Sequence, residues 1–236
     1  ARVMIQSSKF NGSWSQFTKG WWGEGNYEEI CLANTRTDFT RISSWAGFAP
    51  NQKFVVVSLP AVTLLCDTSF YGNNSQHMCG NSRWEDFSLP NLQSANKRAL
   101  GFYDASGTLT LPSAKYICAE AFYHCNYMEG LVLAETSKTL AAISNSAFRA
   151  TSLDVGHLKR VVLGCAANCF LDASVFENQP LEEVVLTGAR PTVKATSCWS
   201  DQAELKITFA VPKDDPVWAA ALDGKVTPLA DAERQA

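Results

Sequence analysis

The chain has 236 residues, of which 46% are hydrophobic and 18% are charged, and its net charge at pH 7 is −3. This composition predicts a globular protein with a continuous core rather than a disordered chain. An acidic chain with scattered Lys and Arg residues argues against a nucleic-acid partner, which normally needs a basic face. No run of about 18 apolar residues is present, so no membrane-spanning segment is predicted.

The first 27 residues match no other part of the chain and carry Trp14, Trp21 and Trp22. They lack the charged and apolar regions of an export signal, so we expect a soluble chain or a mature form whose signal was removed. The Trp rings could form an aromatic platform that stacks on a glycan or a peptide. They could equally shield the first coil of the fold that follows, and we favour such an N-terminal cap over residues 1–27.

A short alternating run recurs through residues 28–212. Its equivalent positions are Leu32, Leu59, Leu89, Leu111, Leu133, Leu163, Leu186 and Phe209. Four of the seven intervals are 22 or 23 residues long, and the others are 27 or 30. In a strand such as Leu109–Leu111, alternation turns the two leucines inward and Thr110 outward. Pro60, Pro90 and Pro112 follow the strand Leu and turn the chain, because proline has no N–H for a ladder.

Two further apolar positions follow each run. The first lies six residues beyond the strand Leu and includes Leu65, Ala95 and Ile117; the second is a landmark that is aromatic or Leu. The landmark is Trp45, Phe70, Leu100, Phe122, Phe148, Phe176 and Trp199. A last apolar position is expected at Tyr127, Leu153, Leu181 and Leu205. One coil cannot bury these residues alone, whereas stacked coils share one core, so the period predicts a solenoid. The strands of a β-sandwich, the alternative, recur every 8 to 12 residues.

The segments LTLPSAKYICAEAFYHCNYMEGLVL, LAAISNSAFRATSLD and SVFENQPLEEVVL closely resemble BspA-type leucine-rich repeats of bacterial surface proteins. The resemblance implies an α/β leucine-rich-repeat solenoid that is rich in β-structure and winds as a right-handed superhelix. It further implies a concave parallel sheet of about eight strands, an irregular or 3₁₀ convex side and a short C-terminal capping helix. Members of this family are mostly secreted or surface-attached and are implicated in adhesion. The resemblance brings no catalytic residues.

Two insertions interrupt the period, at residues 71–84 and 149–160. The first carries Tyr71, His77 and Trp84, and the second carries Asp154, His157 and Arg160. Because both enter just before a strand, we expect them at the same edge of the solenoid. Loops on a rigid repeat scaffold commonly carry recognition, although loop drift without a role explains either insertion equally well.

The outward rows of the strands offer few anchors for a partner. The middle row is small and uncharged, with an apolar stripe at Val132, Val162 and Val185 that β-propensity alone explains. The stripe could also receive an extended peptide, a lipid edge or a partner domain. We expect binding to be carried by the insertions and the N-terminal Trp segment, through Trp14, Trp21, Trp22, Tyr71, His77, Trp84, His157 and Arg160.

Residues 213–236 are expected to form a capping helix and a tail. Asp214, Asp215 and Pro216 suit a helix N-terminus, Gly224 suits its end, and Trp218 would cover the last coil. The eight cysteines form no C-x-x-C pair, and with three histidines they give no zinc spacing, so no metal or other cofactor is predicted. We favour free, buried thiols over a disulfide framework.

No nucleophile elbow, metalloprotease helix or phosphate-binding loop is present, so no catalytic residues are predicted. A dyad of His124 and Cys125 is conceivable, but Cys125 occupies a repeat position that packs inward. The lack of catalytic motifs predicts a non-enzymatic module, and the family resemblance implies that it is extracellular or at the cell surface and binds a protein or glycan at a host or microbial surface. The alternative is a structural spacer of the bacterial envelope that has no soluble ligand.

Overall fold

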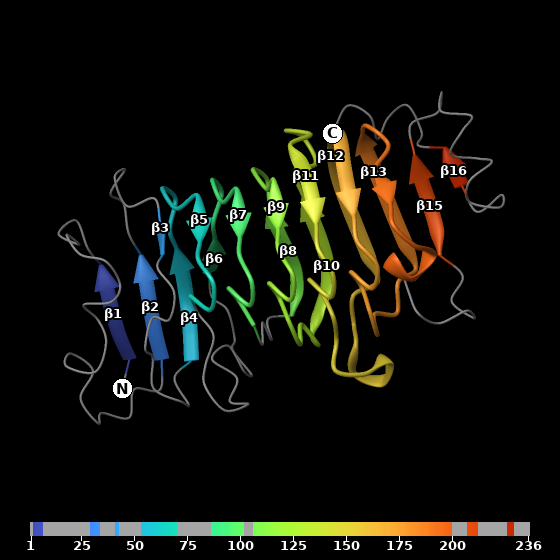
Figure 1. Ribbon diagram of the computed structural model, residues 1–236. Coiled ribbons are helices and arrows are strands. Elements are labelled where there is room, and N and C mark those ends of the chain that lie inside the picture. The colour runs from blue at the N-terminus through green and yellow to red at the C-terminus, as the bar shows by residue number, and fades with distance from the viewer. Residues whose placement is uncertain are drawn as a thin grey trace.

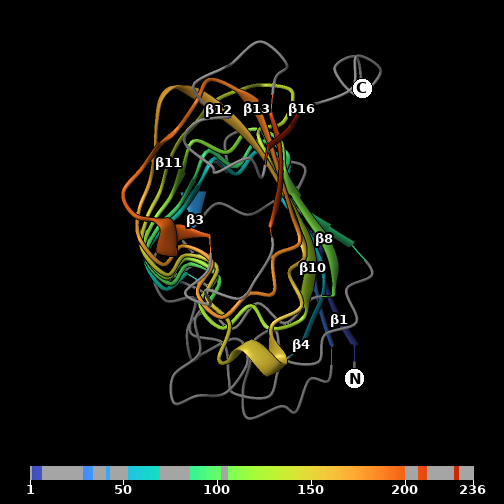
Figure 2. The ribbon, with the colours of Figure 1, turned by 90° about the vertical axis from the view of Figure 1, so that its right-hand side faces the viewer.

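The computed structural model describes residues 2–6, 29–33, 41–42, 53–69, 86–101, 106–199, 207–211 and 226–228. These residues form a β-rich, solenoid-like structure in which each coil contributes a first strand and, in most coils, a shorter second strand (Figure 1). Every strand pairing among them is parallel. Viewed along the solenoid axis, the coils superimpose, with the first strands on one side and the second strands on the other (Figure 2).

The first strands, here called the first ladder, run in two hydrogen-bonded groups. One group is β1 (Arg2–Gln6), β2 (Glu29–Ala33), β4 (Lys53–Ser58) and β6 (Asp86–Ser88). The other is β8 (Gly107–Leu111), β10 (Met128–Leu133), β12 (Arg160–Leu171), β13 (Glu183–Gly188), β15 (Thr208–Val211) and β16 (Val226–Pro228). All eight strands that the period predicts are present. β1 and β16, one at each end, were not predicted.

The second strands form one continuous second ladder. In order, they are β3 (Arg41–Ile42), β5 (Leu64–Leu65), β7 (Ser94–Ala95), β9 (Tyr116–Ile117), β11 (Leu140–Ile143), the C-terminal end of β12 and β14 (Thr192–Val193). An irregular or 3₁₀ side was predicted here, so that prediction is wrong for these coils. Rungs of two residues are too short to leave an alternating pattern in the sequence.

β12 belongs to both ladders. Its N-terminal half pairs with β10 and β13, and its C-terminal end pairs with β11 and β14. Gly164 lies where the strand passes the preceding coil, and a Cβ there would sit 1.7 Å from the carbonyl oxygen of Ala134. Only glycine allows the two backbones to approach this closely.

The strand leucines of successive coils lie side by side as predicted. Leu111 pairs with Leu133, Leu133 with Leu163, and Leu163 with Leu186. At the ends the register differs from the prediction: Leu32 lies opposite Val57 instead of Leu59, and Phe209 lies opposite Val184 instead of Leu186. A slip of two residues leaves the alternation unchanged, so the pattern cannot exclude it. In β2 this slip begins at Cys31, after an irregularity between Ile30 and Cys31.

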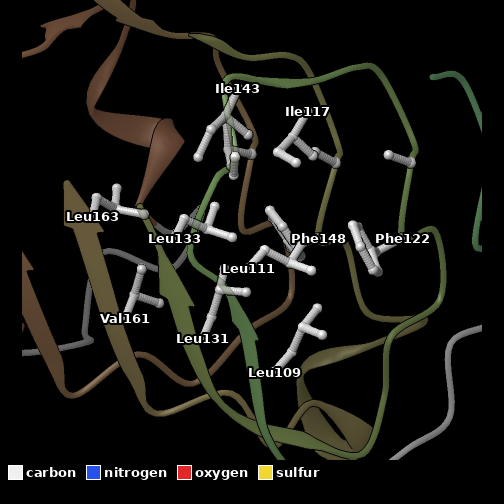
Figure 3. Close-up of a cluster of buried hydrophobic side chains, with 14 of the residues drawn as sticks. Leu109, Leu111, Ile117, Phe122, Leu131, Leu133, Ile143, Phe148, Val161 and Leu163 are labelled. Atoms are coloured by element: carbon white, nitrogen blue, oxygen red, sulfur yellow. The ribbon is translucent and has the colours of Figure 1, made fainter. Parts of the chain in front are cut away.

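A single core fills the space between the two ladders. Leu111 and Leu133 from the first ladder lie on the side of the core toward Ile117 and Ile143 from the second, and Leu109 and Leu131 lie on the far side of them (Figure 3). The landmark residues form a row at the turn, where Phe122, Phe148 and Phe176 are fully buried. The ring centroids are 5.0 Å apart for Phe122 and Phe148 and 5.8 Å apart for Phe148 and Phe176, and Trp199 extends the stack at 6.1 Å from Phe176. Leu100, the landmark one coil earlier, is buried as well, and Phe70, two coils earlier, lies outside the described residues.

The turn before each landmark repeats one backbone conformation. The residue two positions earlier is left-handed in five consecutive coils, with φ between 53° and 56°, at Thr68, Arg98, Glu120, Ser146 and Ser174. None is a glycine, so each costs about 1 kcal/mol or more. The landmark amides offset this cost by bonding to the next coil, from Phe122 to Ala147 at 2.8 Å and from Phe148 to Val175 at 3.0 Å.

Two residues predicted in the core lie at the surface. Tyr127 is 44% exposed, and its neighbour Met128 occupies the buried position at the start of β10. Leu153 is half-buried in a 3₁₀ helix, η2 (Leu153–Val155), and Leu158 takes the core position instead. Leu181 is buried as predicted. The insertion shifts the core position, because η2 consumes residues that an uninterrupted coil would place inward.

The outer face of the first ladder carries a second, smaller apolar cluster. Val162, Val185 and Ala210 are buried there, and Val132 packs against them. The turn after β10 lies beside this stripe, since Thr187 Oγ1 donates to the carbonyl of Glu135 at 3.2 Å. The apolar stripe at Val162 is therefore covered rather than open as a groove.

The described residues contain two short helices, and they leave the predicted capping helix and the handedness of the superhelix untested. Within the described part of the chain, the helices are η2 and a second 3₁₀ helix, η3 (Thr196–Cys198). No helix in that part is long and apolar enough to cross a membrane. The capping helix predicted over 213–236 falls on residues outside the description, except that 226–228 form β16. The handedness of the superhelix stays a prediction.

Candidate binding surface

Two of the eight predicted binding residues lie in the described part of the chain. His157 and Arg160 belong to the insertion at 149–160, which lies at the edge where the first strands begin (Figure 2). The other six, Trp14, Trp21, Trp22, Tyr71, His77 and Trp84, lie outside the described residues and stay predictions.

The insertion folds into one 3₁₀ turn. The amides of Val155 and Gly156 both donate to the carbonyl of Ser152, at 3.3 and 3.1 Å. Ser152 has extended backbone angles and its hydroxyl caps no amide of the turn. The turn is therefore held less by its own capping than by its neighbours.

The preceding coil fixes the insertion through Asn126. The side-chain oxygen of Asn126 accepts from the Thr151 amide at 2.9 Å and from the Thr151 hydroxyl at 3.2 Å. Its carbonyl oxygen lies 2.9 Å from Nδ1 of His157. One residue thus binds both ends of the insertion.

The following coil fixes the insertion through Gln179, whose side chain is fully buried. Its Oε1 accepts from the Leu158 amide at 3.2 Å, and its Nε2 donates to the carbonyls of Phe148 at 2.9 Å and Cys125 at 3.1 Å. A buried amide that satisfies three backbone groups is costly to replace, because each group would lose its partner. Gln179 therefore joins three coils beneath the insertion.

His157 is exposed, and the bonds of its ring define the protonation of one nitrogen. Nδ1 lies 2.9 Å from the carbonyl oxygens of Asn126 and Val155. Carbonyl oxygens only accept hydrogen bonds, so Nδ1 must carry the hydrogen. In the neutral ring, Nε2 is then an acceptor that faces away from these two bonds.

Tyr127 and Val155 surround this histidine. The ring centroids of Tyr127 and His157 are 5.9 Å apart, and Tyr127 and Val155 are 44% and 37% exposed. Together the three residues form what we call the His157 surface. Sequence analysis missed Tyr127 because an aromatic residue just before a strand fits the apolar pattern equally well. The neighbouring Met128 could have indicated which of the two residues is buried, because Met has no polar group to satisfy and suits the interior better than Tyr127 does.

The cations beside the His157 surface are paired with carboxylates of the next coil. Arg160 Nε lies 2.6 Å from Glu183 Oε2, and Lys159 Nζ lies 2.7 Å from Glu182 Oε1. The hydrogen bond from Lys159 to Glu182 raises the pKa of the lysine. All four groups are exposed, so the pairs add little stability. Arg160 therefore has a carboxylate partner in the next coil, and its role in binding stays a prediction.

The cysteines of the described ranges are not joined in disulfides, and most of them belong to the interior. Cys66, Cys125, Cys165, Cys169 and Cys198 are buried, and Cys118 is half-buried. Burial raises the pKa of the Cys198 thiol, and the nearby Asp172 and Cys169 raise it further. Burial and Asp67 likewise raise the pKa of Cys118. The thiols of Cys198 and Cys118 therefore stay protonated at neutral pH and are poor nucleophiles.

The possible His124–Cys125 dyad receives no support from the local contacts. Cys125 is fully buried, donates to the Arg149 carbonyl at 3.8 Å and accepts from Gln179 Nε2 at 3.4 Å. The His124 ring stacks on Tyr123 at 3.8 Å. Cys125 therefore packs inward, as its repeat position predicts.

Over the described ranges, no group of three or more His, Cys, Asp or Glu residues could hold a metal ion. Comparisons with models of protein families, with curated proteins and with solved structures gave no match to this chain. The role of the His157 surface must therefore be inferred from its own geometry.

Proposed function

We propose that this chain is a non-enzymatic binding or adhesion module, built on a BspA-type leucine-rich-repeat scaffold, that acts outside the cell or at its surface. Its partner is a protein or a glycan, and the His157 surface forms part of the contact. The repeat motifs and the matched register of Leu111, Leu133 and Leu163 support the scaffold.

One observation carries the proposal: the insertion at 149–160 exposes apolar and aromatic groups on a backbone that is fixed on both sides. Asn126 binds it from the preceding coil and Gln179 from the following coil. Exposed aromatic groups that are already ordered lose little entropy on binding, which favours recognition.

The test is a binding assay of the full chain against immobilised matrix proteins and a glycan array. A Tyr127→Ala and His157→Ala double variant should weaken the strongest interaction at least tenfold. Both side chains are exposed, so loss of the His157–Asn126 hydrogen bond should lower the urea midpoint only slightly. Lys97→Ala, an exposed substitution on another coil, is the matched control and should bind as the wild type does.

The outcomes are separable. Full affinity in the double variant would move the contact away from the His157 surface. A wild-type chain that binds no member of either panel but self-associates would favour the envelope spacer instead.

A further inference from the structure

We propose that the outer face of the second ladder, around Tyr116 and Phe170, binds a linear, uncharged, β-linked glycan that runs along the solenoid axis. This inference deepens the proposed function, on which its biological role rests, but it concerns a different face of the molecule. No contact of the His157 surface takes part in it.

The site consists of two exposed aromatic rings in one register row. Tyr116 of β9 pairs with Ala142 of β11, and Ala142 pairs with Phe170 of β12. The next residues along the same strands, Ile117, Ile143 and Leu171, are buried. Strand alternation therefore turns Tyr116, Ala142 and Phe170 outward together, where the two rings are 51% and 39% exposed.

The spacing of the rings suits a chain of sugars. Tyr116 and Phe170 lie two rungs apart, which for parallel strands is about 10 Å. In an extended β-linked glycan every second pyranose ring presents the same face, and one ring advances by nearly one strand spacing. A chain along the axis could therefore stack alternate rings on Tyr116 and Phe170 while the ring between them passes over the small Ala142.

The flanking row supplies hydrogen-bonding groups. Two residues further along the same strands lie Cys118, Ser144 and Asp172, and Lys194 of the next coil binds Asp172 at 2.8 Å. The hydrogen bond from Lys194 keeps the pKa of Asp172 below its usual value, so the carboxylate can accept from sugar hydroxyls. Within this row the only charges are this one opposite pair. A row whose cation is paired with its anion suits an uncharged, hydroxyl-rich ligand better than an acidic or basic polymer.

A protein partner fits this face less well. The core of a stable protein interface buries a cluster of large anchors, often Trp, Tyr and Arg. Here Ser94 and Thr192 border the two rings on the outer row. Isolated aromatic rings among small polar groups suit sugars better, because the face of an aromatic ring can stack on the face of a pyranose ring.

The experiment measures binding of the full chain to cellohexaose by titration calorimetry, with maltohexaose and heparin as comparators. Wild type should bind cellohexaose and should bind the curved α-linked maltohexaose and the anionic heparin at least tenfold more weakly. Tyr116→Ala and Phe170→Ala should each weaken cellohexaose binding at least tenfold, because each removes one stacking ring. Ala142→Glu should do the same by placing a charged side chain between the rings.

Controls keep the result attributable to this face. Both rings are exposed, so circular dichroism and the urea midpoint should stay unchanged in the ring variants. Tyr127→Ala should leave cellohexaose binding intact. Chitohexaose and mannohexaose extend the test to other uncharged β-linked chains.

The inference falls if no uncharged β-linked hexasaccharide binds, if heparin binds best, or if Tyr127→Ala removes binding as fully as Phe170→Ala does. The chain could bind a protein through Tyr127 and His157 and yet bind none of cellohexaose, chitohexaose and mannohexaose. That result would leave the proposed function standing and reject this site alone. If the chain binds cellohexaose but no protein of the panel, the site at Tyr116 and Phe170 stands and the role of the His157 surface in the proposed function is rejected.

Discussion

The central coils and the terminal coils of this solenoid are held in register differently. From β8 to β13, equivalent leucines lie opposite one another, and a stack of rings from Phe122 to Trp199 runs through the same coils. At the two ends, Leu32 lies opposite Val57 and Phe209 lies opposite Val184, which displaces the equivalent residues by two positions.

The difference shows what fixes register in a parallel ladder. Alternation specifies which face a residue occupies, but a displacement of two residues leaves that face unchanged. A second contact must therefore select among the permitted registers. In the central coils we assign that role to the interior ring stack, because each ring occupies one place per coil.

The largest expected effect concerns the ring stack itself. Phe148 is fully buried between Phe122 and Phe176, so Phe148→Ala should lower the free energy of unfolding by about 4 kcal/mol through lost burial and a cavity. Phe170→Ala removes the same atoms from an exposed position and should cost less than about 1 kcal/mol. Urea unfolding measures both, and equal losses would show that the stack does not hold the centre.

A smaller effect is expected where two coils touch through glycine. A Cβ at Gly164 would meet the Ala134 carbonyl oxygen, which is backbone, so Gly164→Ala should destabilise the fold by about 3 kcal/mol. A Cβ at Gly130 would meet Thr108 Oγ1 at 2.5 Å, and that side chain can rotate away. Gly130→Ala should therefore cost about 1 kcal/mol, and adding Thr108→Ala should recover most of it. Equal thermal shifts for the two single variants would contradict this ranking.

The smallest change in stability, and the most direct test of the terminal register, comes from paired cysteines. Val185 lies opposite Ala210, so Val185→Cys with Ala210→Cys should form a disulfide under mild oxidation. Thr208 lies opposite Glu183, and its Cα is displaced from that of Val185 by about 8 Å, which is too far for a disulfide. Peptide mapping by mass spectrometry identifies the bond. Efficient linkage of the Val185→Cys and Thr208→Cys pair would instead place the terminal strand in the register that the repeat alignment predicts.

Much of the fold could be predicted from the sequence, because the same apolar pattern recurs in repeat after repeat. The inward leucines, the buried apolar position at Leu65, Ala95 and Ile117, and the ring row at Phe122 are all where the period predicts. The second ladder was not predicted, since a two-residue strand such as Tyr116–Ile117 leaves no alternation to detect. The exposed rings of Tyr116 and Phe170 escaped notice for the same reason.

The candidate surface was predictable only as a location. The insertion at 149–160 follows from a break in the period, and His157 follows from its presence there. Its partners Asn126 and Gln179 do not, because they come from other coils and are ordinary polar residues in the sequence. The ion pair of Arg160 with Glu183 does not follow from the sequence either, because only the register places these two residues side by side.

The sequence by itself determined that successive coils share one interior, because a Leu and an aromatic residue in each coil can be buried only by stacking. It also determined which face of each first strand is inward, since a strand alternates with a period of two. Only the tertiary structure decided the register at the ends, the burial of Val162 on the outer face and the alignment of Tyr116 with Phe170. These depend on which residues of different coils lie opposite one another, and a pattern within one strand does not contain that information.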